Sequence, residues 1–279
     1  MKSNLNMPEL SPALKDAARA AVAKMSELNL AQSAIEKEET LDFLTLQEAM
    51  DFCALDGVEA TYDELYMAKN KGKTTPATDA VKAAQEAIGL GFERCESSEK
   101  ITQGDMVAIF AALNAGDAKA LENDENLAIL ETFLSAEDEA HPLVKIASAQ
   151  YFILRNAVFG AASARMAQIL TLLFLVQKRL LVLPILGFAA FVRVRRRRYD
   201  EILSADFERD EASERAEGMV AYAQSSNLDE EAKNLAAFVD YALGAFTQAA
   251  ALTVRLVQNR VEAAAAAKPK DPLANINIE

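Results

Sequence analysis

The residues 151–170, YFILRNAVFGAASARMAQIL, place a short turn of small residues between two apolar runs. A turn of this kind before a helix can form a phosphate site, because the free N–H groups at a helix start attract anions. Gly160, Ser163 and Arg165 are the residues that could contact such an anion. The stretch contains no histidine and no carboxylate. It therefore predicts either a residual anion site or a tight turn between two buried helices.

A second chemical feature is the arginine run RVRRRR at 193–198, with five arginines in six positions. A dense guanidinium cluster can bind an anionic partner, because each guanidinium offers several donors. The run could also be a solvated helix face that balances the acidic segment from Asp200 onward. Both interpretations stay open. The candidate partner-binding residues are Arg193, Arg195, Arg196, Arg197 and Arg198.

The composition of the 279 residues favours helix nearly throughout, with 10 glycines and 7 prolines. The net charge of −13 argues against general nucleic-acid binding. Residues 151–203 nevertheless hold nine basic and two acidic side chains, so a basic island of +7 lies within an acidic chain. Two cysteines make no disulfide framework, which favours a reducing compartment, and we expect a cytoplasmic protein.

The apolar runs at 169–176 and 180–192 are the most membrane-like part of the chain. Each is shorter than the roughly 18 residues that a spanning helix needs, and the second contains Pro184 and Gly187. We therefore expect buried core helices and no membrane partner. No signal peptide is recognised at the N-terminus.

Helix signals recur along the whole chain. Ser11 and Pro12 predict a helix start, and further helices are expected over 78–91 and 102–113. The predicted architecture is one all-α domain without an internal repeat. It divides into an N-terminal helical segment at 1–40, a main body at 41–265 and a flexible tail at 266–279.

The order of these segments resembles the Fic (Fido) family, whose active members transfer AMP from ATP to hydroxyl side chains. ALDGVEATYDELY looks like the family's IEGIxTTLDEL segment. ENLAILETFLSAEDEAHPLVKIASAQYFIL is similar to the helices that lead into the family's active site. RMAQILTLLFLVQKRLLVLPILGFAAFVRVRRRRYDEIL follows the pattern of the helices after the catalytic loop. The resemblance extends over about residues 8–262 and implies a Fic-like helical domain.

The family's catalytic loop reads HPFxDGNGRxxR, and RNAVFGAASARM at 155–166 occupies its place. A guanidinium at the position of the histidine base cannot accept a proton. By this alignment no catalytic residue, metal ligand or cofactor is assigned. His141, the single histidine, is expected to be a helix-entry residue. The degenerate loop positions are Arg155 for the base, Phe159 for the metal-binding acid, the retained Gly160, Ala161 and Ala162 for Asn and Gly, and Ser163 for the first arginine.

Two further segments depart from the family pattern. Active members carry a β-hairpin flap, but NAGDAKALENDEN at 114–126 is too short and too poor in β-formers for one. Many members also carry an inhibitory [ST]xxxE[GN] helix whose glutamate pairs with the catalytic arginine. Here Phe52 and Asp56-Gly57 occupy the matching positions.

These departures predict a catalytically inactive Fic-fold pseudoenzyme that acts as a binding or regulatory subunit. The expected partner is a protein, either a second copy of the chain or an active Fic AMP-transferase, with no nucleic acid involved. One alternative is a nucleotide-binding protein with residual or altered AMP-transfer chemistry through Gly160, Ser163 and Arg165. Another is a structural assembly component that buries the acidic stretch 117–139 or the last helix.

Overall fold

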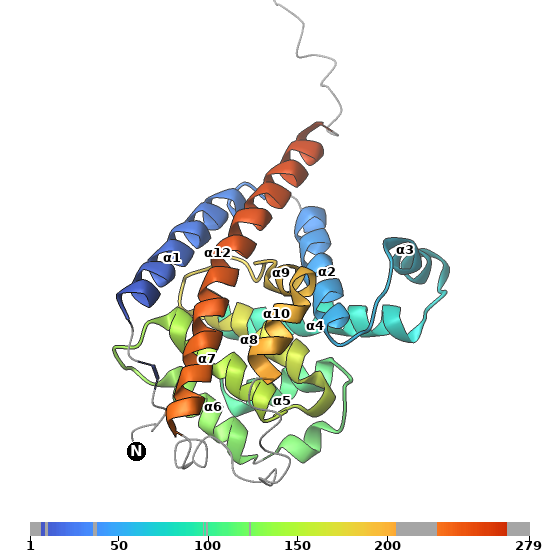
Figure 1. Ribbon diagram of the computed structural model, residues 1–279. Coiled ribbons are helices and arrows are strands. Elements are labelled where there is room, and N and C mark those ends of the chain that lie inside the picture. Colours follow the sequence, from blue (N-terminus) through green and yellow to red (C-terminus); the bar gives the residue numbers. More distant parts are fainter. Residues whose placement is uncertain are drawn as a thin grey trace, which may run out of the picture.

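The computed structural model describes residues 7–8, 11–35, 38–96, 98, 100–122, 124–204 and 228–266. Within these residues the chain forms helices and no strand, which confirms the predicted all-α class (Figure 1). The helices are α1 Pro12–Gln32, α2 Glu38–Leu55, α3 Tyr62–Lys71, α4 Pro76–Glu96, α5 Gln103–Ala112, η1 Ala118–Leu121, α6 Glu125–Ser135, α7 Pro142–Arg155, η2 Gly160–Ala162, α8 Ser163–Gln177, α9 Phe188–Val194, α10 Arg196–Ser204 and α12 Leu228–Ala266.

Helix starts follow the local sequence signals. The Ser11 hydroxyl accepts a hydrogen bond from the Leu14 N–H at 3.2 Å, and Pro12 opens α1 as predicted. Thr61 and Thr102 form capping boxes with Glu64 and Asp105 at the starts of α3 and α5. These caps satisfy N–H groups that a helix start leaves without partners.

The helix expected over 78–91 is longer in the structure, where α4 runs from Pro76 to Glu96. Gly91 does not end the helix, because this glycine lies within α4 where the helix packs closely on α8. A Cβ atom at Gly91 would collide with the Leu173 side chain of α8. The small residue therefore lets α4 and α8 approach each other inside the helix body.

The core forms around α7 and α8, which lie side by side near the centre of the molecule (Figure 1). Every residue of α8 from Met166 to Leu175 is buried. The long α12 packs on α7 and along α1 (Figure 1). The sequence predicts one apolar stripe on the last helix, made of Phe238, Ala242, Phe246, Ala249 and Leu256. The first four are buried, whereas Leu256 is only partly buried.

Two helical stretches are long and apolar enough to cross a membrane, namely Gly160–Gln177 and Asn234–Ala263. The first stretch includes the run 169–176, which alone is shorter than a membrane-spanning helix. It reaches spanning length because the apolar residues from Gly160 onward extend it. Buried positions make up 67% of the first window and 50% of the second. Core helices of soluble proteins pass the same test, so these stretches are weak evidence for a membrane.

One side of α2 carries hydrogen-bond acceptors that face neighbouring helices. We call this set the acceptor row, and it consists of the carboxylates of Glu48 and Asp51, the Leu55 carbonyl, and the carboxylate of Asp56 just after the helix. Glu48 and Asp51 are almost fully buried, at 3% and 2% exposure. Burying a carboxylate costs free energy unless hydrogen-bond donors or cations contact it. The segments that pack on this side of α2 must therefore supply such groups.

Glu48 fixes the chain that leads into α9. Its Oε1 accepts hydrogen bonds from the N–H groups of Leu186 and Gly187 at 2.6 and 2.5 Å. The Thr253 hydroxyl of α12 donates to the Leu186 carbonyl at 2.8 Å. Gly187 has φ +73°, and a Cβ there would collide with Thr253. Glycine, glutamate and threonine together set the position of α9 and of the arginine run that follows.

Burial makes Glu48 a source of pH-dependent stability. Burial raises the pKa of Glu48 from 4.5 to about 7, although the two N–H donors oppose the shift. Between these two values the folded protein keeps a proton that the unfolded chain has lost. The contribution of Glu48 to the free energy of unfolding therefore falls as pH rises through this window.

We predict that Glu48→Gln removes this pH dependence, because the amide keeps an acceptor oxygen and never ionises. At pH 8 the variant should be the more stable protein by up to about 3 kcal/mol, and at pH 4 the difference should vanish. Urea denaturation across this pH range measures both quantities. Glu86→Gln, on the exposed face of α4, is the control. An unchanged pH slope in Glu48→Gln would contradict the assignment.

Candidate functional site

The turn between α7 and α8 is held by its own backbone. The N–H of Val158 donates to the Ile153 carbonyl at 3.2 Å, and the N–H of Gly160 donates to the Ala157 carbonyl at 2.7 Å. Ala157 and Gly160 both adopt left-handed conformations, with φ of 45° and 55°. This backbone favours glycine at 160 and is strained at an alanine such as 157. The turn is a compact hydrogen-bonded joint.

Ser163 belongs to this joint. Its hydroxyl accepts a hydrogen bond from the Phe159 N–H at 3.0 Å and donates to the Gly160 carbonyl at 2.8 Å. It is 6% exposed and is the first residue of α8, whose N-cap is Ala162 without a side-chain cap. The hydroxyl therefore points back into the turn, and both of these hydrogen bonds are internal.

Phe159 is a core side chain. It is 3% exposed, and its ring centroid lies 6.0 Å from that of Phe110 on α5. Ala162 is fully buried, whereas Gly160 and Ala161 face solvent. The position that the alignment gives to a metal-binding acid thus anchors the turn to α5 by aromatic packing.

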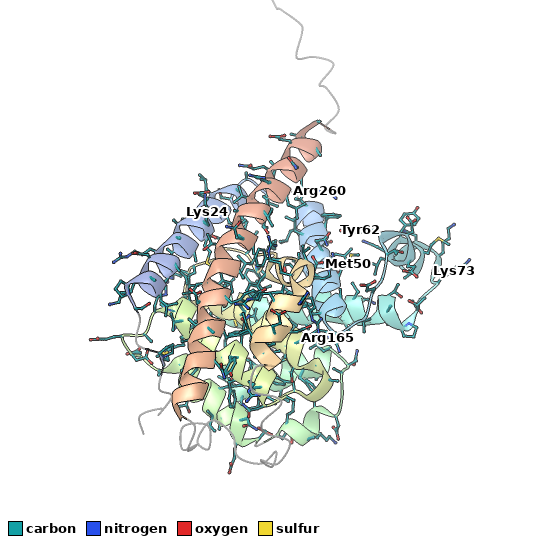
Figure 2. The ribbon with its side chains drawn as sticks, in the orientation of Figure 1. Lys24, Met50, Tyr62, Lys73, Arg165 and Arg260 are labelled. Atoms are coloured by element: carbon teal, nitrogen blue, oxygen red, sulfur yellow. The ribbon has the colours of Figure 1, made fainter. Side chains whose placement is uncertain are left out.

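Arg165 of α8, which is labelled in Figure 2, forms an ion pair with Asp56, which follows the last turn of α2. The Arg165 Nε lies 2.5 Å from Asp56 Oδ2, and the two side chains are only 11% and 12% exposed. Burial raises the pKa of Asp56, and the adjacent Arg165 guanidinium partly offsets the rise. The nearby Cys53 thiol is also buried, which raises its pKa to about 11. A charge-assisted hydrogen bond of this kind compensates two charges that would be costly alone.

Arg155 lies in the last turn of α7 and is half-buried. A cation there is favoured, because the carbonyl end of a helix carries partial negative charge. His141, by contrast, lies at the other end of α7. Its Nδ1 accepts a hydrogen bond from the Leu143 N–H at 3.2 Å, as expected for a helix-entry residue. Burial lowers the pKa of His141.

The arginine run does not form one helix face. Helix α9 ends at Val194, Arg195 lies between the two helices, and α10 begins at Arg196. Two of the arginines contact the acceptor row of α2. Arg193 Nη2 lies 3.2 Å from Asp51 Oδ1, and Arg196 Nη1 donates to the Leu55 carbonyl at 2.7 Å. These two side chains therefore hold α9 and α10 against α2.

The other members of the run face outward. Arg197 is 94% exposed and pairs with Glu201 at 2.9 Å, and Arg198 lies 3.7 Å from the same carboxylate. Arg195 places its guanidinium carbon 4.1 Å from the centroid of the Phe191 ring. All five predicted partner-binding residues are exposed, but Arg193 and Arg196, each 49% exposed, are engaged with α2, which leaves Arg195, Arg197 and Arg198 as the outer part of the run.

The acidic stretch 117–139 uses several of its carboxylates within the fold. Asp117 and Asp124 cap η1 and α6 through hydrogen bonds to the N–H groups of Lys119 and Asn126. Asp138 pairs with the buried Lys145 at 2.9 Å. In the described part of the stretch, these residues act as caps and anchors of a connection between helices.

In the part of the chain that the structure describes, no three or more His, Cys, Asp or Glu side chains are grouped so as to hold a metal ion. Comparison with protein-family models and with curated proteins returns no match for this chain.

The sequence analysis did not predict the acceptor row of α2. Its signal is the position of Glu48 and Asp51, which share the helical spacing of Leu44, Phe52 and Leu55 and so fall on the apolar face of the helix.

We predict that the ion pair of Asp56 and Arg165 is a stability element. Asp56→Ala should lower the free energy of unfolding by about 3 kcal/mol or more, because it leaves a buried guanidinium uncompensated. Arg165→Met should have a similar effect. The double variant should lose less than the sum of the two, as measured in a double-mutant cycle by urea denaturation.

Asp200→Ala provides the matched control. This aspartate forms an analogous pair with Arg196 at 2.8 Å, but both side chains are about half exposed, at 51% and 49%. Its loss should cost under about 1 kcal/mol. Additive effects of the Asp56 and Arg165 substitutions would show that the two charges are not coupled.

Proposed function

We propose that this chain is a catalytically inactive binding protein with a Fic-like arrangement of helices, and that it recognises its partner through the outer part of the arginine run. The observation that supports the proposal is that the polar side chains at the turn between α7 and α8 are bonded to other groups of the chain. Arg165 is paired with Asp56, and the Ser163 hydroxyl is bonded to the turn backbone. A nucleotide at this turn would have to break these contacts before gaining its own.

The exposed arginines support a role in binding. Arg195 and Arg197 extend from the α9–α10 junction, where Arg193 and Arg196 anchor the helices to α2. A rigid support reduces the entropy cost of presenting charged side chains to a partner. An acidic protein surface is the partner that fits. Two classes follow, a second copy of this acidic chain and a catalytically intact Fic protein that it would regulate.

The proposal predicts that tagged protein recovers a stoichiometric partner from its source lysate and loses it in Arg195→Glu/Arg197→Glu. Both substitutions alter exposed charges, so the fold and its melting temperature should stay within the usual range of surface variants. Mass spectrometry identifies the retained protein, and light scattering of the purified chain distinguishes self-association from a different partner.

The matched control reverses two exposed charges elsewhere, in Arg19→Glu/Lys82→Glu, whose side chains are 77% and 73% exposed. This variant should retain the partner. If both double variants lost the partner to the same extent, the loss would reflect the change in net charge and not the arginine run. A monomer that retains no protein at any salt concentration would contradict the proposed function.

A further inference from the structure

A groove lies between the C-terminal parts of α1 and α12, two helices that pack along each other (Figure 1). Its volume is about 420 Å³, which is within the range of sites that bind other molecules. The residues that line it are Glu27, Leu30, Ala31 and Ala34 of α1 and Val254, Gln258, Val261 and Glu262 of α12. Leu30 is 75% exposed. The groove thus offers an apolar floor that no described segment covers.

The charged residues that line the groove are both acidic. Glu262 is exposed and forms no ion pair with a described residue. Glu27 pairs with Lys24 of its own helix at 2.7 Å, but its side chain is still 55% exposed. Arg255 lies two helical turns before Glu262, and neither Arg255 nor Lys24 lines the groove. An apolar floor with carboxylates beside it suits an apolar side chain that cations accompany.

The arginine run carries this complementary combination. Val194, the last residue of α9, is 77% exposed. Arg195 and Arg197 are also exposed, and they follow so closely that even an extended chain would keep them within about 11 Å of Val194. This short segment therefore presents an apolar side chain together with guanidinium groups.

The run lies too far from the groove of its own chain to enter it. The Tyr199 ring of α10 packs against Tyr241 of α12, with 5.9 Å between the ring centroids. Val254, the first groove residue of α12, lies about 20 Å farther along the helix axis at about 1.5 Å per residue. Contacts with α2 also hold the run in place. A run that fills this groove therefore belongs to a second molecule.

We infer that the groove between α1 and α12 binds the arginine run of a second copy of this chain. Val194 of one copy lies on the apolar floor of the other, and Arg195 and Arg197 face the two carboxylates. The inference rests on the proposed function, because it uses the same outer part of the run, and it names the second copy as the partner. The net charge of −13 opposes self-association in general, so the contact depends on this local match.

Sedimentation of the full chain over a range of concentrations tests the inference with two charge-reversed variants. One carries Arg195→Glu/Arg197→Glu in the run, and the other carries Glu27→Lys/Glu262→Lys in the groove. The unaltered chain should self-associate, and each variant alone should do so at least about tenfold more weakly, because like charges then meet. An equal mixture of the two variants should associate within about threefold of the unaltered chain, because each run then meets a groove of opposite charge.

Leu30→Ala tests the apolar floor. It should weaken self-association about tenfold, because the truncation removes apolar surface that the contact buries. Leu252→Ala is the matched control, since this leucine of α12 is 54% exposed and does not line the groove. It should associate within about twofold of the unaltered chain, and neither exposed substitution should alter the fold.

The inference is overturned if the unaltered chain is a monomer at every concentration, if the groove variant associates as the unaltered chain does, or if the mixture associates as weakly as its components. Equal effects of Leu30→Ala and Leu252→Ala would also overturn it. The proposed function can survive these results. A groove variant that keeps its partner, beside a run variant that loses it, would refute the groove alone. A monomeric chain that recovers a different protein through the arginine run would do the same.

Discussion

The fold depends on a single constraint, the buried acceptors on one side of α2. Glu48, the Leu55 carbonyl and Asp56 accept hydrogen bonds from other parts of the chain, whereas Asp51 accepts one from Gln47 of α2 itself and forms an ion pair with Arg193 of α9. The chain before α9 supplies backbone N–H groups, while α9, α10 and α8 supply arginines. Because unpaired buried carboxylates are costly, these contacts must form together, and they fix the relative positions of α2, α8, α9 and α10. The pair of Asp56 and Arg165 is the most buried ion pair of this set and connects residues 109 positions apart.

The same constraint explains why the turn between α7 and α8 is a structural joint. Arg165 is the cation nearest in sequence to the turn on its α8 side, and Asp56 holds it in the interior. Ser163 closes the turn through two internal hydrogen bonds, and Phe159 anchors it on Phe110. Ser163 and Arg165 are therefore both engaged within the fold, and for this reason we propose the outer part of the arginine run as the binding surface.

The sequence predicted the helical class, the cap at Ser11, the role of His141 and all of the buried stripe of α12 except Leu256, since caps and apolar periodicity are local signals. It also singled out Asp56 and Arg165, but separately, because no local pattern reveals a contact across 109 positions. The arginine run appeared uniform for the same reason. Only tertiary packing shows that Arg193 and Arg196 face α2 while Arg195 rests on Phe191.

The central claim is that the turn is closed by internal contacts and does not bind a nucleotide. Hydrogen–deuterium exchange of residues 156–166, with and without millimolar ATP and Mg²⁺, tests this claim most directly. The account predicts slow exchange at the Phe159 N–H, which is bonded to Ser163, and the same exchange rates in both conditions. Slower exchange across the turn on adding nucleotide, lost in Ser163→Glu, would contradict the account and restore the turn as a ligand site.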